Sequence, residues 1–179
     1  MALKIGICGK MGSGKTTLAN SIIKKHPYFQ RKSLAEGVKN FARFVYNIPE
    51  GRKDRVLFQK IGDGARKELY EDVWITTMLT NCHDDDYIVV DDVRYFNEVK
   101  KLKKRGWKII KINIENNLQE NRIKKTYPDD WKIHLSSRNH NSEIEIDSIP
   151  EEYFDIIIQA SDDDKPTYEL EDFIKGNLP

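Results

Sequence analysis

The fold is decided by one stretch near the amino terminus, Leu3-Lys-Ile-Gly-Ile-Cys-Gly9-Lys-Met-Gly-Ser-Gly-Lys15-Thr16. Its first six residues are mostly apolar and predict a short strand over residues 3–8. The pattern G-x-x-x-x-G-K-[ST] follows at once, and residues 15–25 carry apolar side chains at helical spacing. A strand, a glycine-rich loop and a helix in this order predict a phosphate-binding loop (P-loop).

The chemistry of such a loop explains its residue types. Glycines let successive backbone N–H groups turn toward an anion, and the helix amino terminus adds its positive end. Lys15 is expected to reach the β- and γ-phosphates of ATP, and the Thr16 hydroxyl to ligate Mg²⁺. The residues expected to cradle the nucleotide are Gly9, Lys10, Met11, Gly12, Ser13, Gly14, Lys15, Thr16 and Thr17.

The second half of a magnesium site is expected at the end of a neighbouring apolar strand. Ile88-Val-Val-Asp91-Asp92 supplies a strand with two carboxylates at its end. Asp92 or Asp91 would hold the metal ion through water, and Asp92 is the residue we assign with Thr16.

The rest of the chain alternates strand and helix patterns. Strands are expected over 29–34, 87–91, 107–114 and 153–158, and helices over 36–46, 54–61, 65–79, 97–105, 118–125 and 168–174. We expect a break at Gly62-Asp63-Gly64, and a mobile segment without periodicity over 129–141. The order predicts one α/β domain over residues 1–179, with three layers and a parallel sheet of about five strands flanked by helices.

Composition excludes several classes of protein. Thirty basic and 29 acidic residues among 179 give a net charge of +1, which argues against a protein that coats nucleic acid or an anionic membrane. Cys8 and Cys82 form no disulfide or zinc motif, and no apolar run approaches the roughly 18 residues of a membrane span. With no visible signal peptide, we expect a soluble protein of the cytoplasm, or of the host cytoplasm if it is viral.

Neither N-K-x-D nor D-x-x-G, the signatures expected of a nucleotide switch, occurs in the chain, which is also too short for a motor or helicase. It carries arginines instead, whose planar fork suits phosphate. An enzyme that moves a phosphoryl group onto a phosphate must hold two mutually repelling anions, so it needs several such groups. The candidates are Arg43, Arg66, Arg94, Arg122 and Arg138.

Over residues 4–158 the sequence resembles the deoxynucleoside monophosphate kinases of phages and large DNA viruses, within the nucleoside monophosphate kinase group. Besides the P-loop, four stretches carry the resemblance: Ser33-Leu-Ala-Glu-Gly-Val-Lys39; Leu57-Phe-Gln59-Lys-Ile-Gly62 with Arg66 and Trp74; Val90-Asp-Asp92-Val-Arg94-Tyr-Phe-Asn97-Glu98; and His140-Asn-Ser142-Glu143 before Phe154-Asp155.

The resemblance implies a helical acceptor-binding region over 36–81 and a lid over 116–142. In the first, Arg66 would grip the acceptor phosphate, Gln59 would read the base, and Trp74 and Phe41 would wall a pocket that Lys39 and Arg43 complete. Arg94 would neutralise the transferring group, and Arg122 and Arg138 would close over ATP; with Lys15 these three form the expected catalytic set. A plainer interpretation makes Trp74 and Phe41 core residues, Glu98 a helix start, and Glu143 the partner of a lid arginine.

We therefore expect ATP-dependent phosphoryl transfer to a deoxynucleoside or nucleoside monophosphate for nucleotide precursor supply, with ATP and Mg²⁺ as cofactors. Two alternatives stay open: a kinase for another phosphorylated small molecule such as phosphomevalonate, and a non-catalytic nucleotide-binding regulator. The expected partner is the small-molecule substrate, without nucleic acid or membrane, and the choice between monomer and homodimer is open.

Overall fold

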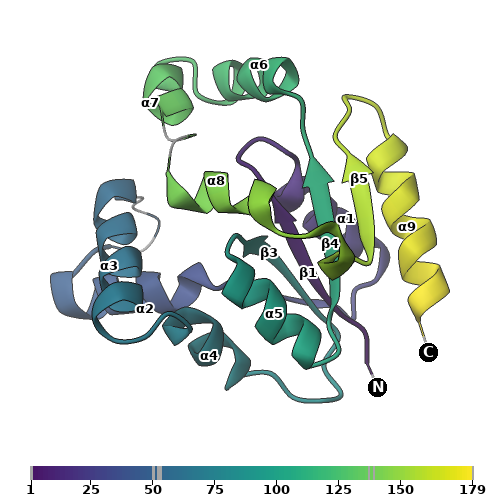
Figure 1. Ribbon diagram of the computed structural model, residues 1–179, viewed down its shortest axis with the longest axis horizontal. Coiled ribbons are helices and arrows are strands. Elements are labelled where there is room, and N and C mark those ends of the chain that lie inside the picture. The colour runs from purple at the N-terminus through teal and green to yellow at the C-terminus, as the bar shows by residue number, and fades with distance from the viewer. Residues whose placement is uncertain (1, 50, 52–53, 137, 139, 179) are drawn as a thin grey trace. The chain divides into compact units, whose positions relative to one another are not determined.

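The computed structural model describes residues 2–49, 51, 54–136, 138 and 140–178, and in these residues five strands form one sheet (Figure 1). The strands are β1 (Lys4–Gly9), β2 (Gln30–Lys32), β3 (Ile88–Val93), β4 (Lys108–Asn113) and β5 (Ile156–Gln159), in the spatial order β2-β3-β1-β4-β5. β1 pairs in parallel with β3 and β4, and β4 pairs in parallel with β5. The predicted parallel α/β sheet is therefore confirmed.

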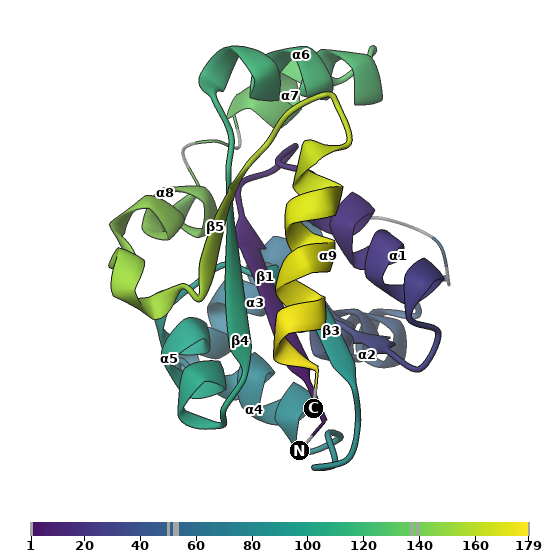
Figure 2. The same cartoon turned by 90° about the vertical axis from the view of Figure 1, so that its right-hand side faces the viewer.

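The described chain divides into two compact units, Met1–Arg31 with Asp84–Pro179 and Lys32–His83. Helices cover both faces of the sheet in the first unit: α1 (Lys15–Lys25) and α9 (Lys165–Asn177) lie on one face, and α5 (Phe96–Lys104) and α8 (Asn141–Ser148) lie on the other (Figure 2). The same unit contains α6 (Asn116–Thr126), α7 (Trp131–Ser136) and a 3₁₀ turn, η2 (Glu151–Tyr153).

The core of the first unit follows from strands that are buried on both faces. Isoleucine and valine from β1, β3, β4 and β5 pack against apolar residues of α1 and α9 in one cluster. On the opposite face Gly6 lets helix α5 approach, because a Cβ there would lie 3.1 Å from Leu102 and 3.0 Å from Ile109. Strands covered on both sides read as nearly continuous apolar runs, which is why the sequence revealed them.

The second unit is helical and has its own packing. It consists of α2 (Ala35–Tyr46), α3 (Arg55–Glu68) and α4 (Val73–Leu79), which contact one another pairwise. The buried Trp74 indole donates its N–H to the Gly62 carbonyl at 3.0 Å. Gly37 lies against the same ring, where a Cβ would come within 2.9 Å of it. Among the described helices of both units, none is long and apolar enough to cross a membrane.

Two helix bounds expected from the sequence are wrong: the break at residues 62–64 is absent, and the helix expected over 65–79 is interrupted between Glu68 and Val73. Helix α3 runs unbroken through Gly62-Asp63-Gly64 and ends only at Glu68, because packing around Trp74 outweighs the roughly 1 kcal/mol that each helical glycine costs. The segment expected to be mobile, 129–141, contains the helix α7, where the rings of Tyr127 and His134 stack at 3.7 Å and Lys124 Nζ lies 4.8 Å from the Trp131 ring, and its mobility stays a prediction. Residues 137 and 139 of that segment lie outside the described residues.

Candidate functional site

The P-loop joins the end of β1 to the start of α1. Gly12 (φ 78°) and Gly14 (φ 100°) take left-handed backbone conformations, and Gly14 is the residue that caps α1. The loop is also closely packed, since a Cβ on Gly9 would lie 2.8 Å from the Ile112 carbonyl oxygen and from Ser13 Oγ. Glycine is therefore required at these three positions for backbone conformation and for space.

Lys15 is buried inside this loop, and its only hydrogen-bond partners among the described residues are backbone carbonyls. Its Nζ donates to Gly9 O at 2.5 Å and to Lys10 O at 2.6 Å. Burial, and next the nearby charge of Arg94, lower the pKa of Lys15 to about 7. Ser13 Oγ is buried as well and has no hydrogen-bond partner in the described part of the chain. A buried ammonium that forms no salt bridge within the described residues, beside an unsatisfied hydroxyl, fits a cradle built for phosphate.

The magnesium side of the site contains Thr16 and a strand-end carboxylate. Thr16 Oγ1 donates to Asp91 Oδ2 at 2.8 Å, and Asp91 is buried. The register of β3 against β1 shifts between the pairs Gly6–Val90 and Cys8–Val93, which places one extra residue in β3 at Asp91-Asp92. Such bulges re-aim side chains next to functional sites. Thr16 and Asp91 are thus suited to hold Mg²⁺ through oxygen, whereas the assignment of Asp92 stays a prediction.

Sequence reasoning missed Arg31, which holds that carboxylate in place. Its Nε donates to Asp91 Oδ1 at 2.9 Å and its Nη2 to Asp91 Oδ2 at 2.6 Å. This two-bond fork fixes the rotation of the carboxylate while Thr16 also contacts it. No local pattern marks Arg31. It lies in the three-residue strand β2, and it meets Asp91 because β2 is the neighbour of β3 in the folded sheet.

Arg94 follows β3 and lies between two glutamates. Glu98 Oε2 accepts the backbone N–H groups of Arg94 at 2.8 Å and of Tyr95 at 3.0 Å, so Glu98 does cap the start of α5. The Arg94 guanidinium donates through Nη1 to Glu143 Oε1. The partner of Glu143 is therefore the arginine at the end of β3 and not a lid arginine.

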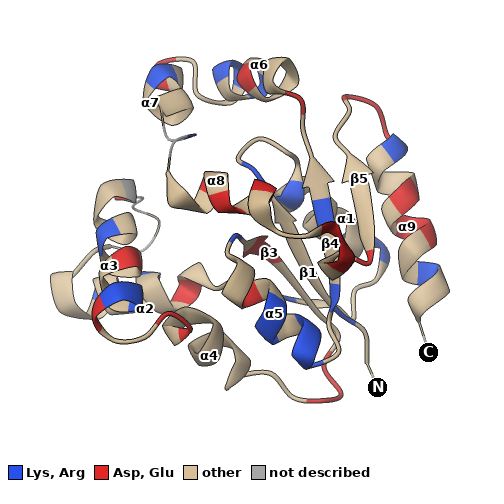
Figure 3. Cartoon of the chain, in the orientation of Figure 1, with Lys and Arg blue, Asp and Glu red and all other residues tan. Residues whose placement is uncertain are grey.

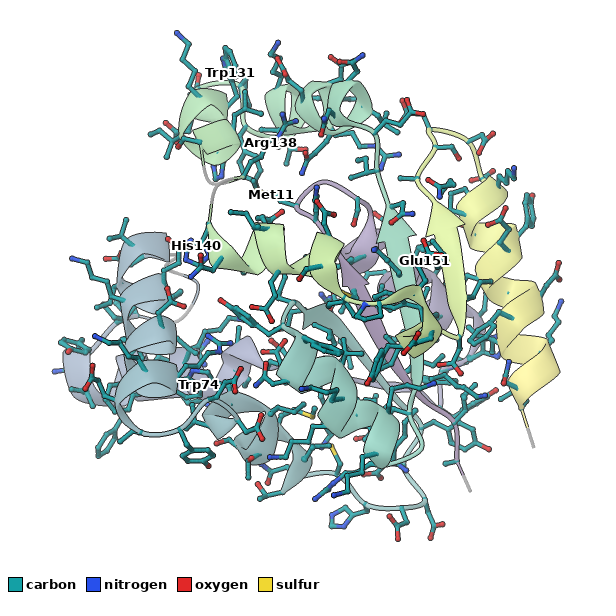
Figure 4. All side chains as sticks on the ribbon, viewed as in Figure 1. Met11, Trp74, Trp131, Arg138, His140 and Glu151 are labelled. Carbon is teal, nitrogen blue, oxygen red and sulfur yellow. The ribbon has the colours of Figure 1, made fainter. Side chains whose placement is uncertain are left out.

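The backbone of the loop is held from outside by side chains of α8 and α6. Glu143 Oε2 accepts the Met11 N–H at 2.8 Å, and Gln119 Nε2 donates to the Met11 carbonyl at 2.8 Å; Met11 is labelled in Figure 4. Lys10 Nζ lies 2.6 Å from Asp147 Oδ2. Gln119 was given no role from the sequence. Its burial is what marks it in the structure, since it is a polar residue that is almost fully buried in a helix.

The segment predicted as a lid carries basic residues on both α6 and α7 (Figure 3). Arg122 Nη1 donates to the Gly12 carbonyl at 3.1 Å, and its Nη2 lies 2.9 Å from Asp162. Arg138 Nη2 donates to the Asn116 carbonyl at 3.0 Å, while its buried Nε has no hydrogen-bond partner among the described residues. Arg122 thus contacts the P-loop, and the movement of the segment stays a prediction.

Apart from Arg94, the acceptor-side candidates lie in the second unit. Arg43 Nη1 donates to Glu36 at 3.2 Å, Lys39 Nζ lies 3.9 Å from the same carboxylate group, and Arg66 Nη1 lies 3.7 Å from Asp63. Phe41 is 47% exposed and Gln59 is partly exposed, whereas Trp74 belongs to the core of the unit. The roles of these six residues toward an acceptor stay predictions.

No protein-family model matches the chain, and no curated protein matches it in sequence. Its fold, however, is similar to solved structures over nearly its whole length. Shikimate kinase from Acinetobacter baumannii, solved with shikimate, is 14% identical with a TM-score of 0.58, covering 98% of this chain and 92% of that one.

Two further structures are similar over nearly the whole chain. Shikimate kinase from Bacteroides thetaiotaomicron is 14% identical (TM-score 0.59, 97% of each chain), and a gluconokinase from Sinorhizobium meliloti is 11% identical (TM-score 0.56, 97% of this chain and 94% of that one). The chain therefore has the three-layer α/β fold of these kinases, as the sequence predicted.

Proposed function

We propose that this protein transfers the γ-phosphoryl group of ATP to a nucleoside monophosphate, most readily a deoxynucleoside monophosphate, and forms the diphosphate. The observation that carries the proposal is the grouping around one loop of a buried ammonium (Lys15), a hydroxyl–carboxylate pair (Thr16 and Asp91) and a guanidinium tied to the loop through Glu143 (Arg94). A simple nucleotide binder has no need of the guanidinium.

Each of these groups has a role that its chemistry suits. The loop amides and Lys15 hold the phosphate tail in line for transfer, and Arg94 offsets the charge that develops on the transferring group. Thr16 and Asp91 would hold Mg²⁺, and the metal ion would supply positive charge that offsets the charge of the phosphate groups. The acceptor phosphate is already ionised, so no general base is required, and alignment with charge stabilisation supplies the catalysis.

The choice of acceptor rests on the resemblance and on charge. Arg66 lies in the motif that resembles the phage-type kinases, and a guanidinium is suited to bidentate binding of a phosphate. Gln59, about two helical turns earlier on α3, offers both a donor and an acceptor for the edge of a base.

A second candidate is favoured by the solved structures. They include kinases of shikimate and of gluconate, which are hydroxy acids, and an arginine binds a carboxylate as readily as a phosphate. Transfer to a hydroxyl would then need a general base, which the first candidate does not.

An ADP-release assay over deoxynucleoside and nucleoside monophosphates, phosphomevalonate, shikimate and gluconate separates the candidates. We expect the highest kcat/KM with a monophosphate, and Lys15→Ala should abolish transfer while Lys24→Ala, an exposed lysine of the same helix, should not. Tight ATP binding without turnover on any acceptor would reject the enzyme in favour of a regulator. Full activity of Lys15→Ala would reject the P-loop as the site.

A further inference from the structure

Glu143 has two partners that come from different sides of the nucleotide cradle. It is buried on the first turn of α8; Oε2 accepts the Met11 N–H of the P-loop at 2.8 Å and Oε1 accepts from the guanidinium of Arg94 after β3. Met11 lies beside α8 in Figure 4. One carboxylate thus joins the loop to the arginine.

The negative charge of Glu143 has a specific use at this position. A buried carboxylate is costly to desolvate, and the neutral side-chain oxygen of a glutamine would also accept the Met11 N–H. The charge therefore serves the other contact, with Arg94. Glu145, also on α8, provides the contrast, because its Oε1 accepts the backbone N–H of Phe96 at 2.8 Å and pairs with no guanidinium among the described residues.

The position of the guanidinium leaves donors available for a ligand. Arg94 uses Nη1 for Glu143, and in the described part of the chain its Nε and Nη2 have no hydrogen-bond partner. The loop itself is fixed on its other side, since Gln119 holds the Met11 carbonyl and Arg122 holds that of Gly12. Glu143 is the direct link between this fixed loop and Arg94.

We propose that Glu143 is a positioning residue, whose carboxylate holds the Arg94 guanidinium at a fixed place beside the P-loop so that its free donors meet the terminal phosphate of ATP. This inference rests on the proposed function, because it assigns Arg94 to the transferring phosphate. It predicts that Glu143 and Arg94 act as one unit and that loss of either affects ATP more than ADP, which lacks that phosphate.

The test measures the affinities for ATP and ADP by titration calorimetry, with Mg²⁺ present and no acceptor. We expect Glu143→Gln to lower the ATP-to-ADP affinity ratio about tenfold, the effect of losing one charge-assisted contact. Arg94→Ala should lower it equally, and the double variant should lower it no further. Glu145→Gln, the matched control on the same helix, should leave the ratio unchanged.

Several results would overturn the inference. If Glu143 merely occupied the place of a phosphate, Glu143→Gln would raise the ratio, since a repelling charge is removed. An unchanged ratio, or losses that multiply in the double variant, would show that the two residues act independently. If Glu143→Gln does not fold, Arg94→Lys, which keeps the charge without the fork, must lower the ratio, and an unchanged ratio there counts against the proposal.

Turnover in the same preparations tests the proposed function separately. If the variants show the predicted affinity changes but the wild-type protein transfers phosphate to no acceptor, the proposed enzyme activity is refuted and the role of Glu143 stands. If the wild-type protein turns over but Glu143→Gln leaves the ATP-to-ADP affinity ratio unchanged, the role of Glu143 is refuted and the proposed enzyme activity stands.

Discussion

Binding of ATP should take up a proton through Lys15. Without nucleotide, burial and the charge of Arg94 lower the pKa of this ammonium to about 7. Phosphate oxygens beside the amine favour its charged form and bring the pKa back toward its ordinary value of 10.5. At pH 8 about nine-tenths of Lys15 is neutral before binding, so binding of one ATP should be accompanied by the uptake of about 0.9 proton from solution. At pH 7 the uptake should fall to about 0.5 proton.

The affinity should follow the same equilibrium. If the bound amine stays charged, the association constant for MgATP falls about 50-fold between pH 7 and pH 9, or about 2.3 kcal/mol. Stability of the nucleotide-free protein should move the opposite way. The unfolded chain holds the Lys15 proton up to pH 10.5 and the folded chain only to about 7, so this residue makes stability rise with pH over that window.

Titration calorimetry at pH 8 in buffers of different ionisation enthalpy counts the protons directly, and at this pH the phosphates of ATP are already ionised. Lys15→Arg is the control, because arginine keeps its charge and should take up none. Uptake near zero in the wild type at pH 8, or equal uptake in Lys15→Arg, would refute the reasoning.

Three further changes have defined outcomes. Arg66→Ala should raise the KM for the monophosphate about tenfold or more and leave that for ATP within a few-fold, since one charge-assisted contact is lost. Ser13→Ala should raise the free energy of unfolding without nucleotide by about 1 kcal/mol, because it removes an unsatisfied buried hydroxyl. Asp155→Asn should be less stable by about 1–2 kcal/mol at pH 7, a deficit that shrinks as the pH falls below about 4.

The sign for Asp155 follows from its contacts. Burial alone would raise the pKa of its carboxyl, but hydrogen bonds from Lys103 and from the Ile109 N–H outweigh it and lower the pKa below 3.8. Chemical unfolding at pH 7 and at pH 3 measures the deficit, and a constant deficit would contradict the assignment. Equal KM effects of Arg66→Ala on both substrates, or a destabilised Ser13→Ala, would contradict the other two predictions.

Elements whose signal lies within a few consecutive residues were predictable. Buried parallel strands such as Ile88–Val93 begin with a run of apolar residues, and the glycines and Lys15 of the P-loop are close together in the chain. Helix ends were harder. Gly62 is a residue type that weakens helices, so the sequence predicted a break there. Its carbonyl accepts a hydrogen bond from the Trp74 indole, and because the two residues are 12 positions apart, the local sequence did not show this contact.

The P-loop cradle and the sheet that presents it follow from local sequence signals, because glycine geometry and apolar periodicity act over short distances along the chain. Which side chains surround that cradle depends instead on long-range contacts in the folded protein. Asp91 meets Thr16 across 75 residues, Arg31 meets Asp91 across 60, and Glu143 meets Met11 across 132. Parallel pairing collects the carboxyl ends of strands that are far apart in sequence, and no local pattern encodes which polar side chains then come within hydrogen-bonding distance.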